Sequence, residues 1–314
     1  MLFVRYLTTR AVMFCAGVAL ILVVSFLVVY WLPGDPARMI LGPRADAQTV
    51  ERFRESAGLN SSIFVQFERF LSRSLKLDFG DSLIQRRPVM DLIRERSRYT
   101  VELILSAIGT LFLFGILIPL SLLALRLGWA DATIRAFWTT LAAAPAYVLS
   151  LVTLTLFAGL LQWIPAIFEP SRVICWIAPA LTLAVYPTSL VSRLFRNALE
   201  SSLNSDYAFR ARAQGFSEPV ILIREALVNS VTAPISAFAN GLAYFVTGTF
   251  FVEVAFGIGG LGTLTYESIR NKDVTVLAGV CLVFAIAVST ISMVLDVAQH
   301  ILDPILRRSH ESVG

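Results

Sequence analysis

The chain has 314 residues, of which 56% are hydrophobic and only 15% are charged. A soluble globular domain is about 45–50% apolar and about 25% charged, so the composition excludes an ordinary soluble domain. The net charge of +4 does not indicate a nucleic-acid-binding protein, because the basic residues stand at the ends of apolar runs, as they do in membrane proteins.

Six apolar runs contain no Asp, Glu, Lys or Arg, and each is long enough for an α-helix to cross about 30 Å of hydrocarbon. The strands of a membrane barrel are shorter and alternate in polarity, whereas these runs are continuous. We therefore expect an all-α integral membrane protein with about six transmembrane helices. The runs are 11–34, 103–125, 136–168, 173–192, 226–252 and 274–295.

The first run predicts a retained transmembrane helix rather than a signal peptide. It is longer than the apolar core of a typical signal peptide, and it ends in Leu-Pro-Gly-Asp-Pro at 32–36 instead of a small-residue cleavage site. Arg5 and Arg10 precede it, further arginines follow the second and fourth runs, and Arg307 and Arg308 come near the end. Because basic residues favour the cytoplasmic side, we expect both termini to be cytoplasmic.

Residues 35–98, between the first helix (1–34) and a membrane core at 99–314, predict an external and partly helical loop. Amphipathic spacing indicates helices at 50–57, 63–77 and 89–96, separated by turn-forming residues. Two interpretations stay open. The loop is either a helical cap on the bundle or a docking surface for an external partner.

Residues 204–227, between the fourth and fifth runs, have the pattern of a helix, a break and a second helix. Asn204 or Ser205 can cap the first helix, and Asp206 falls in its first turn. Gly215 can adopt the left-handed conformation that ends this helix. The Ser-Glu-Pro sequence that follows is typical of the start of the second helix.

The first of these two helices carries side chains suited to contact with another protein. Ala208, Ala211 and Ala213 are small, so that a second surface can approach the helix closely. Arg210 and Arg212 can bind acidic groups or carbonyl oxygens on that surface. An Arg-rich amphipathic helix lying on the membrane is the alternative interpretation of the same spacing.

No nucleotide, metal or catalytic site is indicated. Gly257-Ile-Gly-Gly-Leu-Gly262 matches the G-x-G-x-x-G pattern, but an apolar span rather than a strand precedes it. Lys76 and Lys272 do not stand between Gly and Ser or Thr, as a Walker A lysine must. His300, His310 and the three cysteines lack the spacing of metal ligands.

Charged residues are also scarce inside the predicted spans. Glu102, Glu253 and Asp296 stand near the ends of spans rather than at their centres. A proton-coupled transporter places carboxylates near the middle of the membrane. The positions of these three carboxylates therefore argue against ion coupling and favour transport whose energy is supplied from outside the bilayer.

Several motifs occur together and in order along the chain. The central one is Asp206-Tyr207, then Ala211-Arg-Ala-Gln-Gly215, then a helix that enters a span through Asn229. The others are Leu-Pro-Gly-Asp-Pro at 32–36, Asp78-Phe-Gly80 with Ser82, Arg87-Pro-Val89, Thr100-Val-Glu-Leu103, Val252-Glu-Val-Ala-Phe256, Gly260-Leu-Gly262, Arg270 with Asp273, and Asp296 with Asp303-Pro304.

With these motifs the chain resembles the permeases of bacterial ABC importers over essentially its whole length. More narrowly, it looks like the first of the two permeases in dipeptide, oligopeptide and nickel importers. Gly259 stands where that family usually has Pro, and Pro234 comes one position later than usual. The resemblance implies six spans, an external loop that touches a solute-binding protein, and a coupling helix seated in a groove of a cytoplasmic ATPase.

The resemblance also implies the partners and the coupling residues. The partners are a second homologous permease, two ATP-binding subunits, an extracytoplasmic solute-binding protein and the lipid bilayer of the bacterial cytoplasmic membrane, with no cofactor and no nucleic acid. The residues that it implies for coupling to the ATPase are Asp206, Tyr207, Arg210, Ala211, Arg212, Ala213 and Gly215.

We therefore expect a permease subunit that is not itself an enzyme, with ATP hydrolysis on partner subunits. The expected cargo is a small solute, first of all a di- or oligopeptide, with a nickel chelate or glutathione also open. An ATP-independent secondary transporter or channel is the alternative function.

Overall fold

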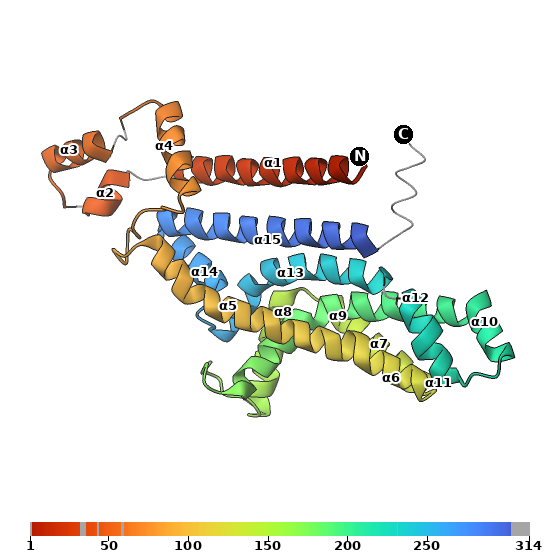
Figure 1. The fold of residues 1–314 in the computed structure, drawn as a ribbon. Helices are drawn as coiled ribbons and strands as arrows, with labels where there is room; N and C mark the ends of the chain where they lie inside the picture. The colour runs from red at the N-terminus through yellow and green to blue at the C-terminus, as the bar shows by residue number, and fades with distance from the viewer. Residues whose placement is uncertain (1, 32–35, 43, 58–59, 231, 303–314) are drawn as a thin grey trace. The chain divides into compact units, whose positions relative to one another are not determined.

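The computed structural model describes residues 2–31, 36–42, 44–57, 60–230 and 232–302, and nearly all of them are helical (Figure 1). No strand forms within these ranges, where Asp81 and Pro88 make an isolated antiparallel bridge. The expectation of an all-α protein is confirmed. Several predictions fall outside the described residues. They concern residues 32–35, Asp303-Pro304, Arg307, Arg308 and His310, and the side chains of Arg5, Asn229, Pro234, Asp296 and His300.

Four helical stretches of the described chain are long and apolar enough to cross a membrane. Two bent pairs of helices raise the number to six if each pair counts as one span. All of them overlap the apolar runs of the sequence. The number of about six spans expected from the sequence therefore corresponds to the higher count. The four are Thr8–Leu27, Val89–Ala124, Val173–Leu203 and Val274–Leu295, and the pairs are Gly128–Ala142 with Ala146–Leu160 and Gly241–Phe256 with Leu261–Asn271.

Proline explains why the third run is bent rather than straight. Helices Gly128–Ala142 and Ala146–Leu160 meet at 107°. Pro145 lies at their junction with an extended backbone, φ −59° and ψ 145°. Proline has no N–H to donate and disfavours helical geometry in the residue before it, so α7 (Gly128–Ala142) ends there and α8 (Ala146–Leu154) begins in a new direction.

The chain forms two compact units: unit 1 contains 1–11, 100–258 and 290–314, and unit 2 contains 12–99 and 259–289. The division into 1–34, 35–98 and 99–314 stays a prediction.

Unit 2 is built around the first turns of α5. The helix expected at 89–96 is not separate, because α5 continues without a break from Val89 to Phe112. Its apolar side packs in a buried cluster of Val89, Leu92, Ile93, Leu261, Leu264, Val276 and Val280. The helices wholly or partly in this unit are α1 (Leu2–Trp31), α2 (Pro36–Leu41), α3 (Ala47–Ala57), α4 (Ile63–Leu75), α5 (Val89–Phe112), α14 (Leu261–Asn271) and α15 (Val274–Leu302).

A buried carboxylate fixes the loop before α5 within unit 2. Asp273, 4% exposed, accepts hydrogen bonds from the Ser82 hydroxyl and from the Thr275 hydroxyl at 2.9 Å. The backbone N–H groups of Leu83 and Val276 also donate to it, each at 3.3 Å. The Ser82 and Asp273 motifs of the sequence therefore form one polar contact that joins this loop to the start of α15.

Unit 1 is organised around α9 (Val173–Leu203), whose buried face packs most extensively on α13 (Thr232–Phe256). A side chain on Gly241 of α13 would come within 3.2 Å of Pro187, and one on Gly248 within 2.9 Å of Leu183. These glycines let the two backbones approach closely, as small residues do in membrane helices. The other elements are η1 (Leu113–Leu117), α6 (Ile118–Ala124), α7, α8, η2 (Thr155–Leu160), α10 (Asp206–Ala213), α11 (Glu218–Ile221), η3 (Leu222–Leu227) and α12 (Val228–Ser230).

Candidate functional site

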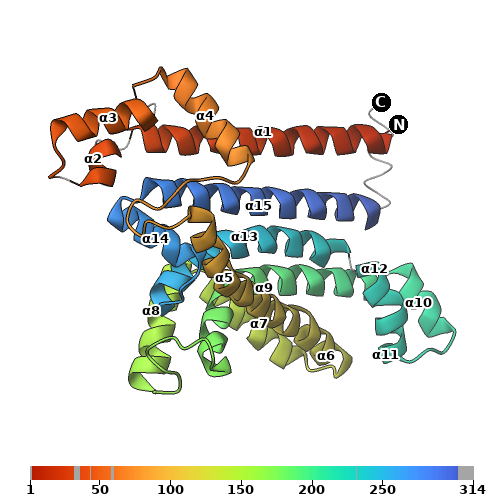
Figure 2. The ribbon, with the colours of Figure 1, turned by 60° about the vertical axis from the view of Figure 1, so that its left-hand side comes forward.

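The segment 204–227 forms a helical hairpin at the Leu203 end of α9, made of α10, α11 and the π-helical η3. Both views show it projecting past the end of α9 (Figures 1 and 2). Only Asn204 and Ser205 separate α9 from α10. Any displacement of the hairpin therefore acts directly on the end of α9.

The start of α10 follows the expected pattern with one difference. Ser205 occupies the N-cap position in an extended conformation, and Asp206 lies in the first turn, where the helix dipole favours a negative charge. The Ser205 hydroxyl donates to the Ser202 carbonyl at 2.6 Å, and no side-chain bond caps the helix there. The hydroxyl thus ties the linker back onto α9.

The end of α10 forms a Schellman motif at Gly215. Its φ of +85° is left-handed, as the sequence predicts. The N–H of Gly215 donates to the Arg212 carbonyl at 2.9 Å, and the N–H of Phe216 donates to the Ala211 carbonyl at 3.2 Å. This turn reverses the chain, and α11 begins after Ser217 with Pro219 in its first turn.

The inner face of the hairpin consists of small and apolar side chains. Ala208 and Ala211 are buried against Ile221 of α11, with Leu203 packed alongside. Two of the three alanines expected to admit a second protein are thus covered by this chain's own helix, because residues three apart lie on the same helical face. Ala213 is exposed.

Arg212 fastens the hairpin internally. Its Nε donates to Glu218 Oε1 at 2.8 Å, its second terminal nitrogen to Oε2 at 3.3 Å, and its first to the Leu203 carbonyl at 3.0 Å. The hydrogen bond with Glu218 raises the pKa of Arg212, and the same bond lowers the pKa of Glu218. One side chain therefore joins the end of α9 to α10 and α11 within this chain, and the role of Arg212 in binding another surface stays a prediction.

The outer face of α10 presents large side chains to solvent. Tyr207 is 60% exposed and Phe209 is 70% exposed, and Asp206 and Arg210 are exposed beside them. The sequence motif includes Asp206, Tyr207 and Arg210 but does not include Phe209. Phe209 stands between Ala208 and Ala211, which form the buried face of the helix, and this spacing is the signal that could have placed Phe209 on the outer face.

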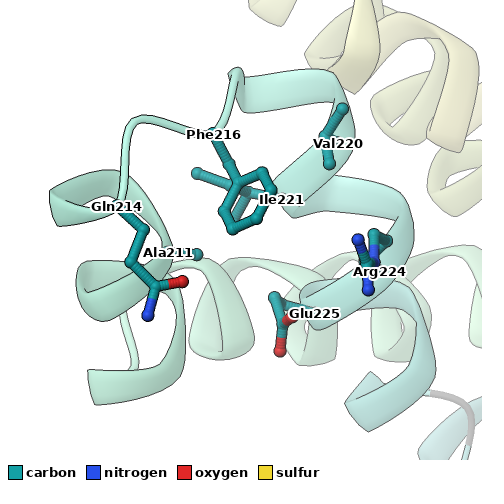
Figure 3. A pocket seen from close by; sticks show the side chains of 7 residues that line it. All are labelled: Ala211, Gln214, Phe216, Val220, Ile221, Arg224 and Glu225. Atoms are coloured by element: carbon teal, nitrogen blue, oxygen red, sulfur yellow. The ribbon is translucent and has the colours of Figure 1, made fainter.

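A pocket of about 190 Å³ opens between α10 and η3. Figure 3 shows Ala211 and Gln214 on one side, Arg224 and Glu225 on the other, and Phe216 on the linking turn. The Arg224 guanidinium lies 5.9 Å from the centre of the Phe216 ring, within the range of a cation–π contact. The lining combines apolar carbon with one basic and one acidic side chain, and Val220 and Ile221 complete it.

The glycine-rich motif at 257–262 lies between two helices. α13 precedes it and α14 follows it, so it lacks the strand before the glycines that a dinucleotide-binding unit needs. Gly257 has a left-handed φ of +68°, and the Ile258 N–H donates to the Glu253 carbonyl at 2.9 Å, which ends α13. Within the described residues, no three His, Cys, Asp or Glu side chains gather as a metal site.

Two family models match the chain in succession. Residues 3–104 match the N-terminal part of the binding-protein-dependent transport system membrane component, and residues 112–308 match the binding-protein-dependent transport system inner membrane component. The second match includes the hairpin, and together the two cover most of both compact units.

Curated relatives match at full length. The glutathione transport system permease protein GsiC of Salmonella paratyphi A is 31% identical over 306 residues, which cover 96% of this chain and 99% of that protein. GsiC of Escherichia coli strain K12 is 30% identical over the same coverage. A chain of the MetNI methionine ABC transporter, solved in inward-facing conformations, has a TM-score of 0.55 at 18% identity, over 68% of this chain and 97% of that one. That likeness concerns the fold alone.

Proposed function

We propose that this chain, which belongs to the family of inner-membrane components of binding-protein-dependent transport systems and is a permease subunit of an ABC importer, is driven through the hairpin at 204–227. A permease subunit is not itself the ATPase of such a system, and its family implies ATP-binding and solute-binding partners. We assign ATPase coupling to α10 and the turn that follows it.

The observation that carries this proposal is the contrast between the two faces of α10. Its inner face is fixed by Ala208, Ala211 and the Arg212–Glu218 pair, whereas its outer face exposes Tyr207 and Phe209. A rigid element that presents exposed aromatic side chains suits a protein interface, where aromatic residues contribute much of the affinity. The exposed Asp206 and Arg210 add charges for orientation.

The hairpin is also packed so that it can move membrane helices. Leu222 and Ala226 of η3 lie in one buried cluster with Phe195 and Leu199 of α9, and Ile116, Leu120 and Leu123 of η1 and α6 pack against it. Force on the hairpin therefore reaches α9 and the helix that contains η1. ATP-driven closure of the partner subunits would switch access to a central cavity by this route.

The finer assignments belong to this proposal. The complex contains a second homologous permease, two ATP-binding subunits and an extracytoplasmic solute-binding protein, and both termini of this chain are cytoplasmic. Similarity to GsiC favours glutathione or a short peptide as the solute. The seven coupling residues are those given by the sequence motif, with Phe209 added.

Affinity capture tests the assignment of the outer face. The tagged chain is co-expressed with the other permease and the ATP-binding subunits of its system, and the ATP-binding subunits retained on the tag are quantified. Tyr207→Ser with Phe209→Ser should weaken their binding at least about thirtyfold, because even one interface aromatic of this kind contributes about 2 kcal/mol. Trp129→Ser, at an aromatic residue that is 75% exposed on α7, is the matched control.

Transport assays in liposomes separate the two classes of function. The assembled complex should take up glutathione or short peptides only with ATP and the binding protein. Uptake by the tagged chain alone, without ATP, would establish the secondary transporter or channel instead. Unchanged retention of the ATP-binding subunits by the double serine variant would refute the role of α10.

A further inference from the structure

Unit 1 contains a buried ion pair between two helices that are distant in the sequence. Arg196 of α9 places Nε 3.3 Å from Oδ2 of Asp131 in the first turn of α7. The two side chains are 10% and 3% exposed. Charges are buried in this way when they are paired, and in membrane proteins such pairs tend to be functional.

The pair is part of a neutral group of four charges. Asp131 Oδ2 also lies 3.4 Å from a terminal nitrogen of Arg135, and Arg196 Nε lies 2.9 Å from Oε1 of Glu200. Glu200 is about half exposed, so the group reaches solvent at that end. The positive end of the α7 dipole adds to the stabilisation of Asp131.

Attraction between charges, rather than fixed hydrogen bonds, holds α7 and α9 together at this point. Among the described residues, no group makes a well-aligned hydrogen bond to Asp131 Oδ2, or to Nε and the first terminal nitrogen of Arg196. Hydrogen bonds weaken steeply when their angle changes, whereas Coulomb energy falls only gradually with distance. The contact can therefore follow small shifts of one helix against the other without breaking.

The position of Arg196 connects this contact to the hairpin. Phe195 and Leu199, on either side of it along α9, pack on Leu222 and Ala226 of η3. The same two turns of α9 thus touch the hairpin through apolar side chains and α7 through charges. α9 then ends at Leu203, two residues before α10.

We propose that the Asp131–Arg196 pair is a positioning contact for transport, which transmits displacement of the α10 end of α9 to α7. Neither residue is assigned to the solute or to nucleotide. The proposal rests on the function proposed above, because the displacement begins at the hairpin. The pair keeps α7 in step with α9 during the movement, while apolar packing alone would let them separate.

The test compares variants that remove the pair in different ways. Asp131→Asn leaves Arg196 with Glu200 alone, and Arg196→Met leaves Asp131 with Arg135 alone. The double variant removes both charges of the pair at nearly constant volume. Arg196→Lys keeps a positive charge close to Asp131, because the ammonium nitrogen of Lys lies only one bond beyond the position of Arg Nε. Glu169→Gln breaks an exposed ion pair with Arg172 in the same unit and serves as the control.

The readout is ATP hydrolysis by the assembled complex in liposomes, with and without the cognate solute-binding protein purified with its own bound ligand. The double variant should assemble in normal amount and keep basal hydrolysis, but its stimulation should fall at least about fivefold, the lower range of coupling between sites. Arg196→Lys and Glu169→Gln should keep most of the stimulation.

A purely structural role predicts a different result. If the pair only neutralises two buried charges, the double variant will be stimulated like the unmodified complex, and the proposal is then wrong. Failure of the double variant to assemble would make the pair a folding requirement and would also overturn it. Failure of the proposed function is distinct, because the Tyr207→Ser, Phe209→Ser variant would then retain the ATP-binding subunits and keep its stimulation, whatever the Asp131 and Arg196 variants do.

Discussion

Gly215 offers a graded test of the hairpin, because the strain that a substitution introduces there comes from the backbone alone. Its φ is +85°, and an added Cβ would meet no atom within 4 Å. Ala at this position therefore introduces backbone strain without a steric clash, and Asn and Val differ from Ala in their access to the left-handed region. Asn enters that region with least strain, Ala with more, and β-branched Val with most.

The expected magnitude follows from that geometry. A non-glycine residue in the left-handed conformation is disfavoured by about 1–2 kcal/mol, which changes the population of the native turn by a factor of about 5–30. The Schellman bonds from Gly215 and Phe216 to α10 form only in this turn. Substrate-stimulated ATP hydrolysis and uptake should therefore decline in the order Gly, Asn, Ala, Val.

The assay measures uptake and stimulated hydrolysis at equal amounts of permease in the membrane. Gly42 provides the matched control, because its φ is +92° and a Cβ added there would also meet no atom within 4 Å, yet it lies in unit 2. Gly42→Ala should reproduce the strain and leave coupling intact. Equal coupling in the Gly215→Val variant and the unmodified permease, or an equal loss in the Gly42 and Gly215 variants, would refute the reasoning.

Three further outcomes are expected. Arg212→Gln should reduce coupling modestly with little effect on insertion. Because the pKa of Glu218 is lowered in the folded hairpin, the stabilisation from its carboxylate is present above the usual carboxyl range and is lost as the pH falls through the folded pKa. Coupling in the unmodified complex should therefore decline on acidification, and coupling in the Arg212→Gln variant should not. Asp273→Asn should destabilise unit 2 by about 2–3 kcal/mol, because a neutral amide replaces a buried acceptor of several hydrogen bonds. The melting temperature should fall and trypsin should cleave faster at Arg86. An unchanged melting temperature would contradict this. A phosphatase reporter fused after Gly42 should be active outside the cell and one fused after the last residue inactive, and the reverse would disprove the proposed orientation.

Much of the fold could be predicted from the sequence because charge-free length is a direct signal for membrane helices. The helix, turn and helix at 204–227 was also predictable, since Gly215 and the Ser-Glu-Pro signal are local features. The bend at Pro145 was less evident, because a proline in a membrane span is compatible with either a kink or a break.

Tertiary partners were beyond the reach of the sequence. Arg212 has the spacing of a surface anchor, and only the folded hairpin brings Glu218 and the Leu203 carbonyl to it. Asp131 and Arg196 lie just outside the apolar runs, where isolated charges normally face water. Their pairing depends on how α7 and α9 pack, which no local pattern encodes.

The two prolines inside α9 affect how that helix responds to a load. Pro179 and Pro187 have no N–H to donate, so the carbonyls of Cys175 and Leu183 lack their usual helical donors. Bending a helix stretches the hydrogen bonds on its outer side, and resistance is lowest where a bond is already missing. The flexural stiffness of α9 is therefore reduced at two levels about 12 Å apart. A torque applied at Leu203 will curve the helix at these levels, so its two halves can take different inclinations in the membrane while each stays helical.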